Sequence, residues 1–373
     1  MGRSRCAKRP GALPDKGTLT PCAGSPGMLL DLTPLSLWTV VAILAGAALV
    51  ICLAGTRLAN LADTLADRTG MGEIIAGALF VGASTSLPGV ITSITTAAQN
   101  YPGLAIGNAL GGLTAQTTFL AVADLAYRKA NLEHAAASVT GLTQGTLLVS
   151  LLTIPLLAMA TPEITLWGVH PASVLLFACY GFGLRLLAEV EDQPMWSPVA
   201  TQHTQDEAEQ AAATGRDERA TAILWWVFLV YAAITAAAGY VVGEAASALV
   251  ELTGLSQSAV GTVFAAVANS LPELVTAIAA VRIGAVNLAV GDVIGGNSFE
   301  VLFLAAADFF YRPGSIYHEF HGDNVFIAVL AILMTGVLLL GMLRRQRHGI
   351  AGIGFESALV LLLYVGSVVL LFV

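Results

Sequence analysis

The sequence predicts an all-α integral membrane protein with ten transmembrane helices, arranged as two inverted five-helix repeats. Hydrophobic residues make up 56% of its 373 residues, and charged residues make up only 11%. A soluble domain carries about 25% charged residues, whereas a membrane protein consists of apolar spans of about 20 residues each. Two further observations, an internal repeat and the number of apolar segments, predict how the spans are arranged.

The chain repeats itself at an offset of 184 residues. When 76–128 is laid over 260–312 without a gap, 19 of 53 positions are identical. Both copies contain Ser-Leu-Pro, at 86–88 and at 270–272. Duplicated halves are typical of secondary transporters, in which the binding site lies between the repeats.

Ten apolar segments are long enough to span a bilayer. They lie at 36–57, 73–99, 103–126, 138–160, 168–188, 221–250, 257–281, 286–310, 324–343 and 352–373. The offset places the first of these segments over the sixth, five spans later. Because an odd number of crossings reverses the direction of the chain, the two halves must be inverted with respect to each other.

These segments divide the chain into four parts. They are an N-terminal tail (1–35), a first five-helix repeat (36–188), a cytoplasmic linker (189–220) and a second five-helix repeat (221–373). The linker is rich in acids, but it lacks the spacing that a calcium-binding loop requires. We interpret it as a solvated connection rather than as a regulatory cation sensor.

Positive charges predict the orientation of the spans. Nearly all Arg and Lys residues between the spans, from Arg57 to Arg347, fall on one side, which the positive-inside rule makes cytoplasmic. Both termini then lie outside, and we expect the protein in the plasma membrane, with lipid as its surroundings. The basic N-terminal tail argues against this orientation, so we hypothesise that translation begins at Met28, which intact mass measurement would test.

Ionisable residues inside a span indicate function, because they are costly to place in hydrocarbon. Glu273 follows Pro272, which lacks a backbone donor and leaves carbonyls near residue 268 without helical partners. The next span carries Asp292 and Glu300 on one stripe, among glycines that allow a close approach. Carboxylate and carbonyl oxygens are ligands for hard cations, so we expect Glu273 and Glu300 to form a cation site. Asp292 would join it if it points inward.

Four motifs resemble the two alpha repeats of the sodium/calcium exchanger family. They are Gly-Ala-Ser-Thr-Ser-Leu-Pro at 82–88 with a glycine-rich stretch at 107–112, and Ala-Asn-Ser-Leu-Pro-Glu at 268–273 with a second such stretch at 291–297. The resemblance extends over the whole membrane body. It implies ten helices around a central group of cation sites, and exchange of calcium for sodium or protons by alternating access.

The resemblance also implies which residues bind the cation. They are Glu273, Glu300, Asp292, Ser270, Asn269, Thr85, Ser86 and Gln116. Some positions depart from the family pattern. Gly89 stands where the family has a second central glutamate, Gly112 and Gly296 replace serines, and Asp292 replaces an asparagine. A missing carboxylate removes a full negative charge from the site, so we expect an exchanger with altered ion selectivity, affinity or stoichiometry.

Other functions remain open at this stage. One is a cation/proton antiporter in which Glu273 carries the proton, and another is a transport-inactive scaffold. An intramembrane enzyme using Ser86 or Ser270 is disfavoured, because all six histidines fall in loops or at span ends. We expect no enzyme activity, no resident cofactor and no nucleic-acid partner, with calcium, sodium or protons as transported cations. The sequence does not predict the oligomeric state.

An outer loop also contains four residues of types that ligate metals. They are His318, Glu319, His321 and Asp323. We interpret them as a polar loop at the membrane interface rather than as a metal site.

Overall fold

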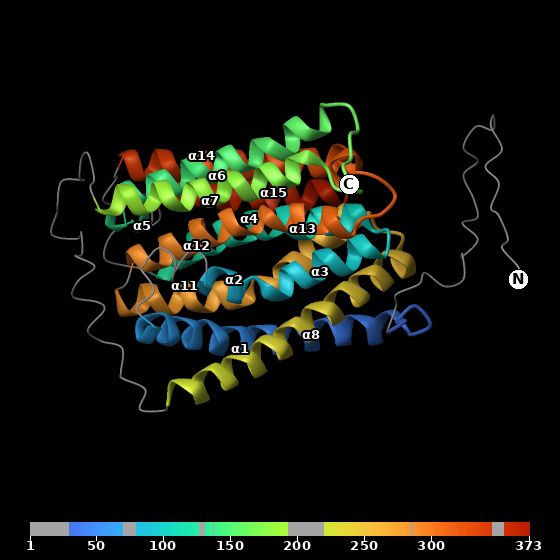
Figure 1. Cartoon of the computed structure of the whole chain (residues 1–373), viewed down its shortest axis with the longest axis horizontal. Coiled ribbons are helices and arrows are strands. Elements are labelled where there is room, and N and C mark those ends of the chain that lie inside the picture. The colour runs from blue at the N-terminus through green and yellow to red at the C-terminus, as the bar shows by residue number, and fades with distance from the viewer. Residues whose placement is uncertain are drawn as a thin grey trace, which may run out of the picture.

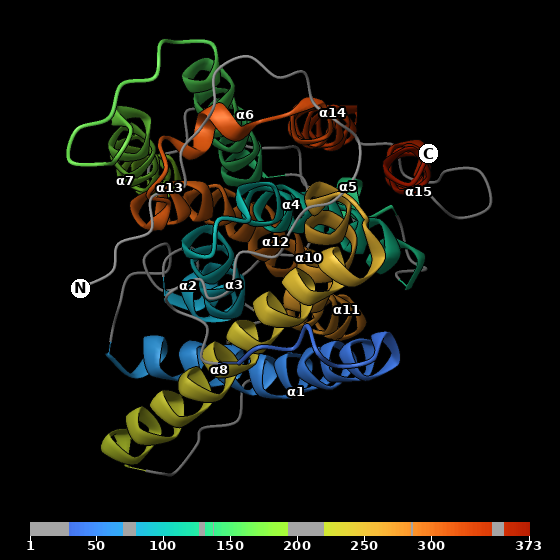
Figure 2. The same ribbon diagram turned by 90° about the vertical axis from the view of Figure 1, so that its right-hand side faces the viewer.

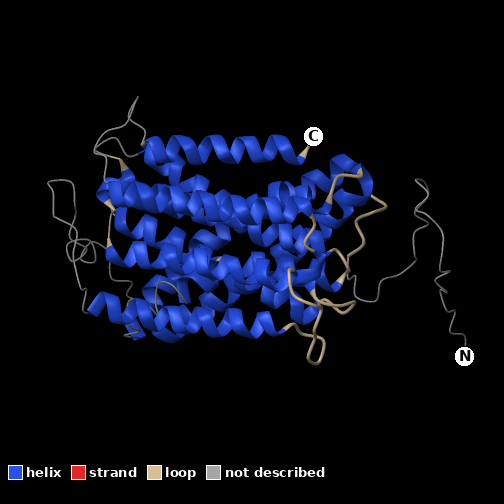
Figure 3. Ribbon diagram, turned by 90° about the horizontal axis from the view of Figure 1, so that it is seen from above, coloured by secondary structure: helices blue, strands red, loops and turns tan. Residues whose placement is uncertain are grey.

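The computed structural model describes residues 30–69, 80–126, 131–136, 138–192, 220–284, 286–344 and 354–373. These residues are almost entirely helical, and the part of the chain that is described contains no β-strand (Figure 3). The first 29 residues, including Met28, and most of the linker lie outside the described residues.

Six helical segments among the described residues are long and apolar enough to cross a membrane. They are α1 (Leu37–Thr69), α6 (Val139–Met159), α7 (Pro171–Asp192), α8 (Thr221–Thr253), the stretch Ala289–Phe310, and α14 (Gly322–Arg344). A bent pair, Gln257–Asn269 with Leu271–Ile283, would make a seventh span. The prediction of an all-α membrane protein is therefore confirmed, whereas the number of ten spans stays a prediction.

The remaining helices are shorter, less apolar or interrupted. In the first half they are α2 (Gly82–Thr85), α3 (Leu87–Ala98), α4 (Pro102–Ala126) and α5 (Leu132–Ala135). In the second half they are α9 (Gln257–Ala259), the π-helix η4 (Val260–Ala265), α10 (Ala266–Asn269), α11 (Leu271–Ile283), α12 (Val286–Glu300), α13 (Leu302–Phe310), the 3₁₀ turn η5 (Ile316–Glu319) and α15 (Phe355–Leu371).

The helices lie roughly side by side in a bundle (Figure 1). Viewed along the bundle, α1 and α8 form one side and α6, α7, α14 and α15 form the other (Figure 2). Helices α4 and α12 lie between these sides, beside the interrupted helices α2/α3 and α10/α11 (Figure 2). α1 and α8 pack against each other and run in opposite directions (Figure 1).

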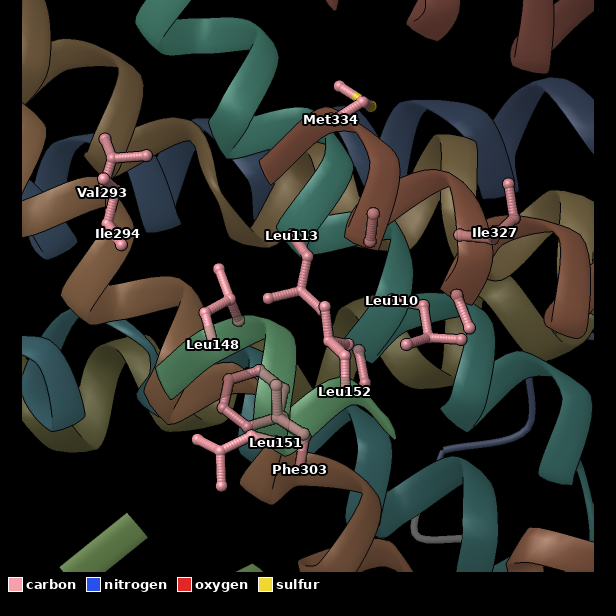
Figure 4. Close-up of a cluster of buried hydrophobic side chains, with 14 of the residues drawn as sticks. Leu110, Leu113, Leu148, Leu151, Leu152, Val293, Ile294, Phe303, Ile327 and Met334 are labelled. Atoms are coloured by element: carbon pink, nitrogen blue, oxygen red, sulfur yellow. The ribbon is translucent and has the colours of Figure 1, made fainter. Parts of the chain in front are cut away.

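A large apolar core joins the central helices to the far side of the bundle. Its buried side chains come from α4, α6, α12, α13 and α14, and include Leu110, Leu113, Leu148, Leu151, Leu152, Val293, Ile294, Phe303, Ile327 and Met334 (Figure 4). Other large apolar side chains, such as Trp226 and Leu333, are exposed, as expected for a surface that faces lipid. Because lipid is as apolar as leucine, close packing rather than burial from water holds these helices together.

Two helices break at equivalent serines, each two residues before a proline. The break between α2 and α3 falls at Ser86, and the break between α10 and α11 falls at Ser270, with a bend of 49° between the two axes. Pro88 and Pro272 have no backbone N–H, so each is tolerated in the first turn of a new helix but not within a continuous one. The sequence predicted the interruption at Pro272, and the structure places it there.

Glycines bring backbones into direct contact at the centre of the bundle. A Cβ atom on Gly239 of α8 would overlap the backbone of Pro88, and one on Gly111 of α4 would lie 2.8 Å from the Cβ atom of Ala266. No real side chain tolerates such distances, so these crossings require glycine. As a result, α8 contacts the first break and α4 contacts the helix before the second.

A buried aspartate closes each copy of the repeat. Asp308 at the end of α13 is fully buried and accepts hydrogen bonds from the His170 N–H, the Ser173 hydroxyl and the Ile316 N–H, at 2.7, 2.7 and 3.1 Å. The first two donors belong to the start of α7, which lies in the other half of the chain. Asp308 therefore fastens the first repeat to the second.

Asp124, the equivalent residue in the first copy, makes the reciprocal set of contacts. It accepts hydrogen bonds from the Leu132 N–H at 2.7 Å, the Gly354 N–H at 3.3 Å and the Ser357 hydroxyl. Gly354 and Ser357 begin α15 and lie 184 residues after His170 and Ser173. The two aspartates are thus exchanged caps, each holding the last long helix of the opposite half.

The Asp308→Ala variant should be markedly less stable, because it leaves the buried N–H groups of His170 and Ile316 without an acceptor. The Ser173 hydroxyl also loses this acceptor and keeps only its contact with the Tyr317 hydroxyl at 2.9 Å. Each unsatisfied buried donor costs about 1–3 kcal/mol, so a large fall in the unfolding temperature in detergent is expected. Asp323→Ala, which removes an exposed acid from the first turn of α14, is the control. Equal unfolding temperatures for the two variants would contradict a structural role for Asp308.

Candidate functional site

Two glutamates are buried at the centre of the bundle. Glu273 lies in the first turn of α11, directly after the break, and Glu300 is the last residue of α12. Their exposed fractions are 8% and 4%, and their carboxyl groups are close enough to interact electrostatically. The first turn of a helix favours negative charge, because its backbone N–H groups are free. The break at Ser270 therefore creates a position suited to the Glu273 carboxylate.

Gln116 of α4 connects the two halves at this point. Its side-chain amide donates to Glu300 Oε1 at 2.6 Å and to the Ser270 hydroxyl at 3.4 Å. Gln116 and Glu300 occupy equivalent positions of the repeat, 184 residues apart. The same offset relates Asn297 to Leu113, whose carbonyl oxygen lies 3.5 Å from the Asn297 amide. Equivalent residues of α4 and α12 therefore meet directly.

Five buried side-chain oxygens in this region have no hydrogen-bond donor within the described protein. They are Gln116 Oε1, Asn269 Oδ1, Glu273 Oε2, Asn297 Oδ1 and Glu300 Oε2. Buried acceptors without donors are costly, and they are the type of oxygen that hard cations coordinate. The arrangement can bind a cation with carboxylate and amide oxygens from α4, α10, α11 and α12.

The predicted residues of the first repeat contribute less to this group. Thr85 of α2 lies within hydrogen-bonding distance of the Glu273 carboxyl group, and its hydroxyl also donates to the Gly82 carbonyl at 3.1 Å. Ser86 is buried at the break beside it. The first repeat therefore adds hydroxyl groups and one amide to the site, but no carboxylate.

Asn269 belongs to a hydrogen-bonded network with residues of α3 and α4. Its amide nitrogen donates to Asn108 Oδ1 at 2.8 Å and to the Thr92 hydroxyl at 3.1 Å. Asn108 in turn donates to Ser93 at 2.8 Å and to the carbonyl oxygen of Gly89 at 3.0 Å. This network links the break in α10/α11 to α3 and α4, and the sequence reasoning did not include it.

Asp292, whose orientation the sequence left open, differs from the two glutamates in its exposure. Its side chain is exposed, whereas those of Glu273 and Glu300 are buried. It interacts electrostatically with Glu273 and with Asp63 of α1. Among the described residues, no three His, Cys, Asp or Glu side chains gather closely enough to hold a metal ion. The central group therefore contains two buried carboxylates, those of Glu273 and Glu300.

The ring of Phe303 fills the space beside Gly89, the residue of the first repeat that is equivalent to Glu273. Gly89 is equivalent to Glu273, and a Cβ atom on Gly89 would lie only 2.6 Å from the ring of Phe303. The ring is 2% exposed, belongs to the apolar core of Figure 4 and packs edge-on against Phe299. The position equivalent to Glu273 is thus filled by an apolar side chain. The sequence predicted the missing carboxylate but not the side chain that takes its place.

Gly112 explains how a glutamate fits at position 300. A Cβ atom on Gly112 would overlap the carboxyl group of Glu300, whereas one on Gly296, its repeat equivalent, would lie 3.6 Å from Gln116 Oε1. Only the first of these glycines is required for room around the site. The absence of a side chain at 112 therefore accompanies the long acidic side chain at 300.

The four residues considered as metal ligands contact separate partners. Asp323 lies in the first turn of α14 and accepts a hydrogen bond from the Ser256 hydroxyl at 3.4 Å. His318 Nε2 lies 2.8 Å from the Thr161 carbonyl oxygen, and His321 Nδ1 lies 2.6 Å from the Glu319 carbonyl oxygen. Glu319 accepts a hydrogen bond from Tyr311 at 2.8 Å. This agrees with the interpretation of the segment as a polar loop.

Comparisons with known proteins agree with the motifs. The sequence model of the sodium/calcium exchanger protein family matches residues 39–187 and 223–373. The protein CaxA of Alkalimonas amylolytica is 28% identical over 317 residues, which cover 83% of this chain and 92% of the relative. These relatives are exchangers and transporters, which sets the intramembrane enzyme aside.

Two solved structures share the fold. The sodium-calcium exchanger NCX_Mj has a TM-score of 0.55 and 17% identity, and the match covers 90% of this chain and 99% of that one. The H⁺/Ca²⁺ exchanger CAX has a TM-score of 0.64 and 13% identity, covering 88% and 82% of the two chains. The chain is therefore a multi-pass integral membrane protein with the fold of these exchangers.

The Gly112→Ala variant should weaken cation binding, because the new methyl group displaces the Glu300 carboxylate. We expect the apparent affinity for the transported cation to fall at least about tenfold, or about 1.4 kcal/mol. Gly296→Ala is the matched control, since it meets only an ordinary contact. Equal affinities for the two variants would show that Glu300 does not bind the cation in this position.

The Gly89→Glu and Phe303→Ala variants should be coupled. The single Gly89→Glu change forces a carboxylate into the phenyl ring and should destabilise the protein, whereas the double variant has room for it. We expect a coupling free energy of about 1 kcal/mol or more in a double-mutant cycle of thermal stability. Additive effects would mean that Phe303 does not fill the space beside Gly89.

Proposed function

The chain belongs to the sodium/calcium exchanger family, and from this premise we propose that it is a secondary active cation antiporter working by alternating access. The observation that carries this proposal is the buried pair Glu273 and Glu300, which has unpartnered oxygens at a helix break in the centre of the bundle. Two uncompensated carboxylates are costly in such a place unless they bind cations.

An inverted arrangement of two five-helix halves, ten spans in all, is part of the proposal. The hydrogen bond between Gln116 and Glu300 supports it, because in a two-fold arrangement only residues near the axis touch their own equivalents. The opposed directions of α1 and α8, whose starts lie 184 residues apart (Leu37 and Thr221), support it as well. In transporters of this type the substrate binds at the interface of the repeats.

Calcium is the transported cation that we propose first. Calcium takes about 6–8 oxygen ligands, and the described protein offers the carboxylates of Glu273 and Glu300, the amide oxygen of Gln116 and the hydroxyls of Thr85 and Ser270. Two carboxylates balance one divalent cation. Ser86, Asn269 and Asp292 stay in the proposal as weaker or more distant contributors, Asp292 at the exposed face of α12.

A cation/proton antiporter is the second candidate. The apolar ring of Phe303 beside Gly89 favours it over sodium exchange, because this half of the site offers no carboxylate for additional sodium ions. The two glutamates would then exchange two protons for one divalent cation, with Glu273 as the predicted proton carrier. We place the protein in the plasma membrane, with both termini outside and the acidic linker in the cytoplasm, as the distribution of Arg and Lys predicts.

Reconstituted protein tests these alternatives. Calcium-45 uptake into liposomes should be driven by an imposed sodium gradient if sodium is the coupling ion, and by a pH gradient if protons are. Glu273→Gln and Glu300→Gln should each reduce uptake to background, because each removes one of the two carboxylates. The control is Glu189→Gln, which changes an exposed acid of α7. Failure of wild-type uptake under both gradients would contradict calcium antiport and favour a transport-inactive scaffold or another ion.

A further inference from the structure

A third buried carboxylate, Glu244, lies outside the site described above. It is in the C-terminal half of α8 and only 1% exposed. Its Oε1 atom accepts a hydrogen bond from the Gln99 amide at 2.7 Å, and Tyr240 also donates to the carboxyl group. Its Oε2 atom has no donor within the described protein. No motif of the sequence analysis includes this residue.

The surroundings of Glu244 provide no positive charge. In the part of the chain that the structure describes, no Lys, Arg or His pairs with it. The segment of α1 that packs against this part of α8 is apolar, with Val40, Leu44 and Ile51 in the shared core. The helices η4 and α10 carry no titratable residue.

The titratable groups around Glu244 are acids and phenols. Asp31, ahead of α1, interacts with it electrostatically, and Tyr240 lies one turn earlier on α8. Glu251, two turns later on α8, accepts a hydrogen bond from Tyr101 at the exposed end of the bundle. A buried carboxylate with only these neighbours is costly in its charged form, so it requires a cation of its own.

The contacts of Glu244 select a proton as that cation. The Gln99 amide and the Tyr240 hydroxyl already donate to the carboxyl group, and Oε2 is the oxygen without a partner. A metal ion needs several oxygens at once, whereas a proton needs one. The group is therefore suited to hold a proton within the membrane.

A row of buried polar side chains on α3 and its C-cap lies between Glu244 and the central site. Thr92, Thr96 and the C-cap residue Gln99 follow one another at helical spacing, and Thr96 donates to the Thr92 carbonyl oxygen at 2.9 Å. Thr92 contacts both the Asn269 amide at 3.1 Å and the Gly239 carbonyl oxygen of α8 at 2.7 Å. At the other end, Gln99 contacts Glu244 and lies 3.4 Å from the Ser247 hydroxyl.

We propose that Glu244 is an outer proton site, which exchanges protons with the outside solution and is coupled to the central cation site through the polar face of α3. It lies between Gly239, at the level of the helix break, and Glu251, at the exposed end of α8. Along a helix these residues are about 7.5 Å and 10.5 Å from it. The inference rests on the proposed orientation for its outer side and on the proposed antiport function for its coupling, whereas proton binding at Glu244 can be measured without either.

Infrared difference spectroscopy of the full-length purified protein tests proton binding directly. A protonated carboxyl group absorbs separately from an ionised one, so a pH titration should show one band that Glu244→Gln removes. Glu251→Gln, an exposed acid on the same helix, should leave that band in place, and Glu244→Asp should restore it at a shifted position. If Glu244→Gln leaves every carboxyl band unchanged across the titration, Glu244 holds no proton and the proposal is overturned.

Transport measurements test the coupling. Glu244→Gln keeps a hydrogen-bond acceptor for Gln99 and should keep the unfolding temperature, but it should lose cation uptake driven by a pH gradient. Glu251→Gln should retain that uptake. An unchanged pH profile in Glu244→Gln would overturn the coupling and leave Glu244 a structural acceptor. If wild-type protein transports nothing yet shows the Glu244 band, the antiport proposal fails while the proton site stands.

Discussion

The hydrogen bond between Gln116 and Glu300 depends on almost every other feature of the centre of the molecule. These residues are repeat equivalents, so they meet only if α4 and α12 cross at the junction of the two halves. That crossing requires room for the Glu300 carboxyl group at Gly112, and Gly111 beside it allows α4 to contact the backbone of η4 at Thr262. The glycines of the repeated segments thus determine how closely the halves approach. The approach in turn decides which oxygens of the two halves can reach one cation.

The two halves share the contacts that hold their helices together but differ in the side chains that they supply to the site. Asp124 and Asp308 are identical and make reciprocal contacts to the opposite half, which fixes both ends of the repeat in the same way. In the middle of the repeat, Glu273 has Gly89, a residue without a side chain, as its equivalent, and the ring of Phe303 fills the space beside Gly89. Both carboxylates of the site therefore come from the second half, while the first half supplies amides and hydroxyls. A duplicated framework can tolerate this divergence, because its stability rests on the caps and the glycine crossings.

Much of this could be predicted from the sequence, because the signals are local or repeated. The apolar spans follow from composition, the break before Pro272 follows from the missing N–H, and Glu273, Glu300 and Gln116 follow from their places in the repeat. The orientation of Asp292 could not be predicted, because its stripe on α12 has both a buried and an exposed edge. Two contacts could not be predicted either, because they depend on which helices pack together. They are the contact of Phe303 with Gly89 and the contact of Glu244 with Gln99. Gln99 and Glu244, for example, are 145 positions apart and are not equivalent in the repeat, so a single sequence does not indicate their contact.

The two halves also differ in the buried polar groups that follow the helix break, because α3 has more of them than its counterpart α11. The first half has lost a carboxylate at position 89, but the same helix retains Thr92, Thr96 and Gln99 on its buried face. Their counterparts in the second half, at 276, 280 and 283, are Thr, Ala and Ile, so only α3 carries a continuous polar face. That face runs from the Asn269 network to Glu244 in the C-terminal half of α8. The two halves therefore differ in what they supply: the second has the buried carboxylates Glu273 and Glu300, and the first has a buried row of neutral polar groups. In the proposed antiporter, this row would couple a proton on Glu244 to a cation site whose charge comes from the second half alone.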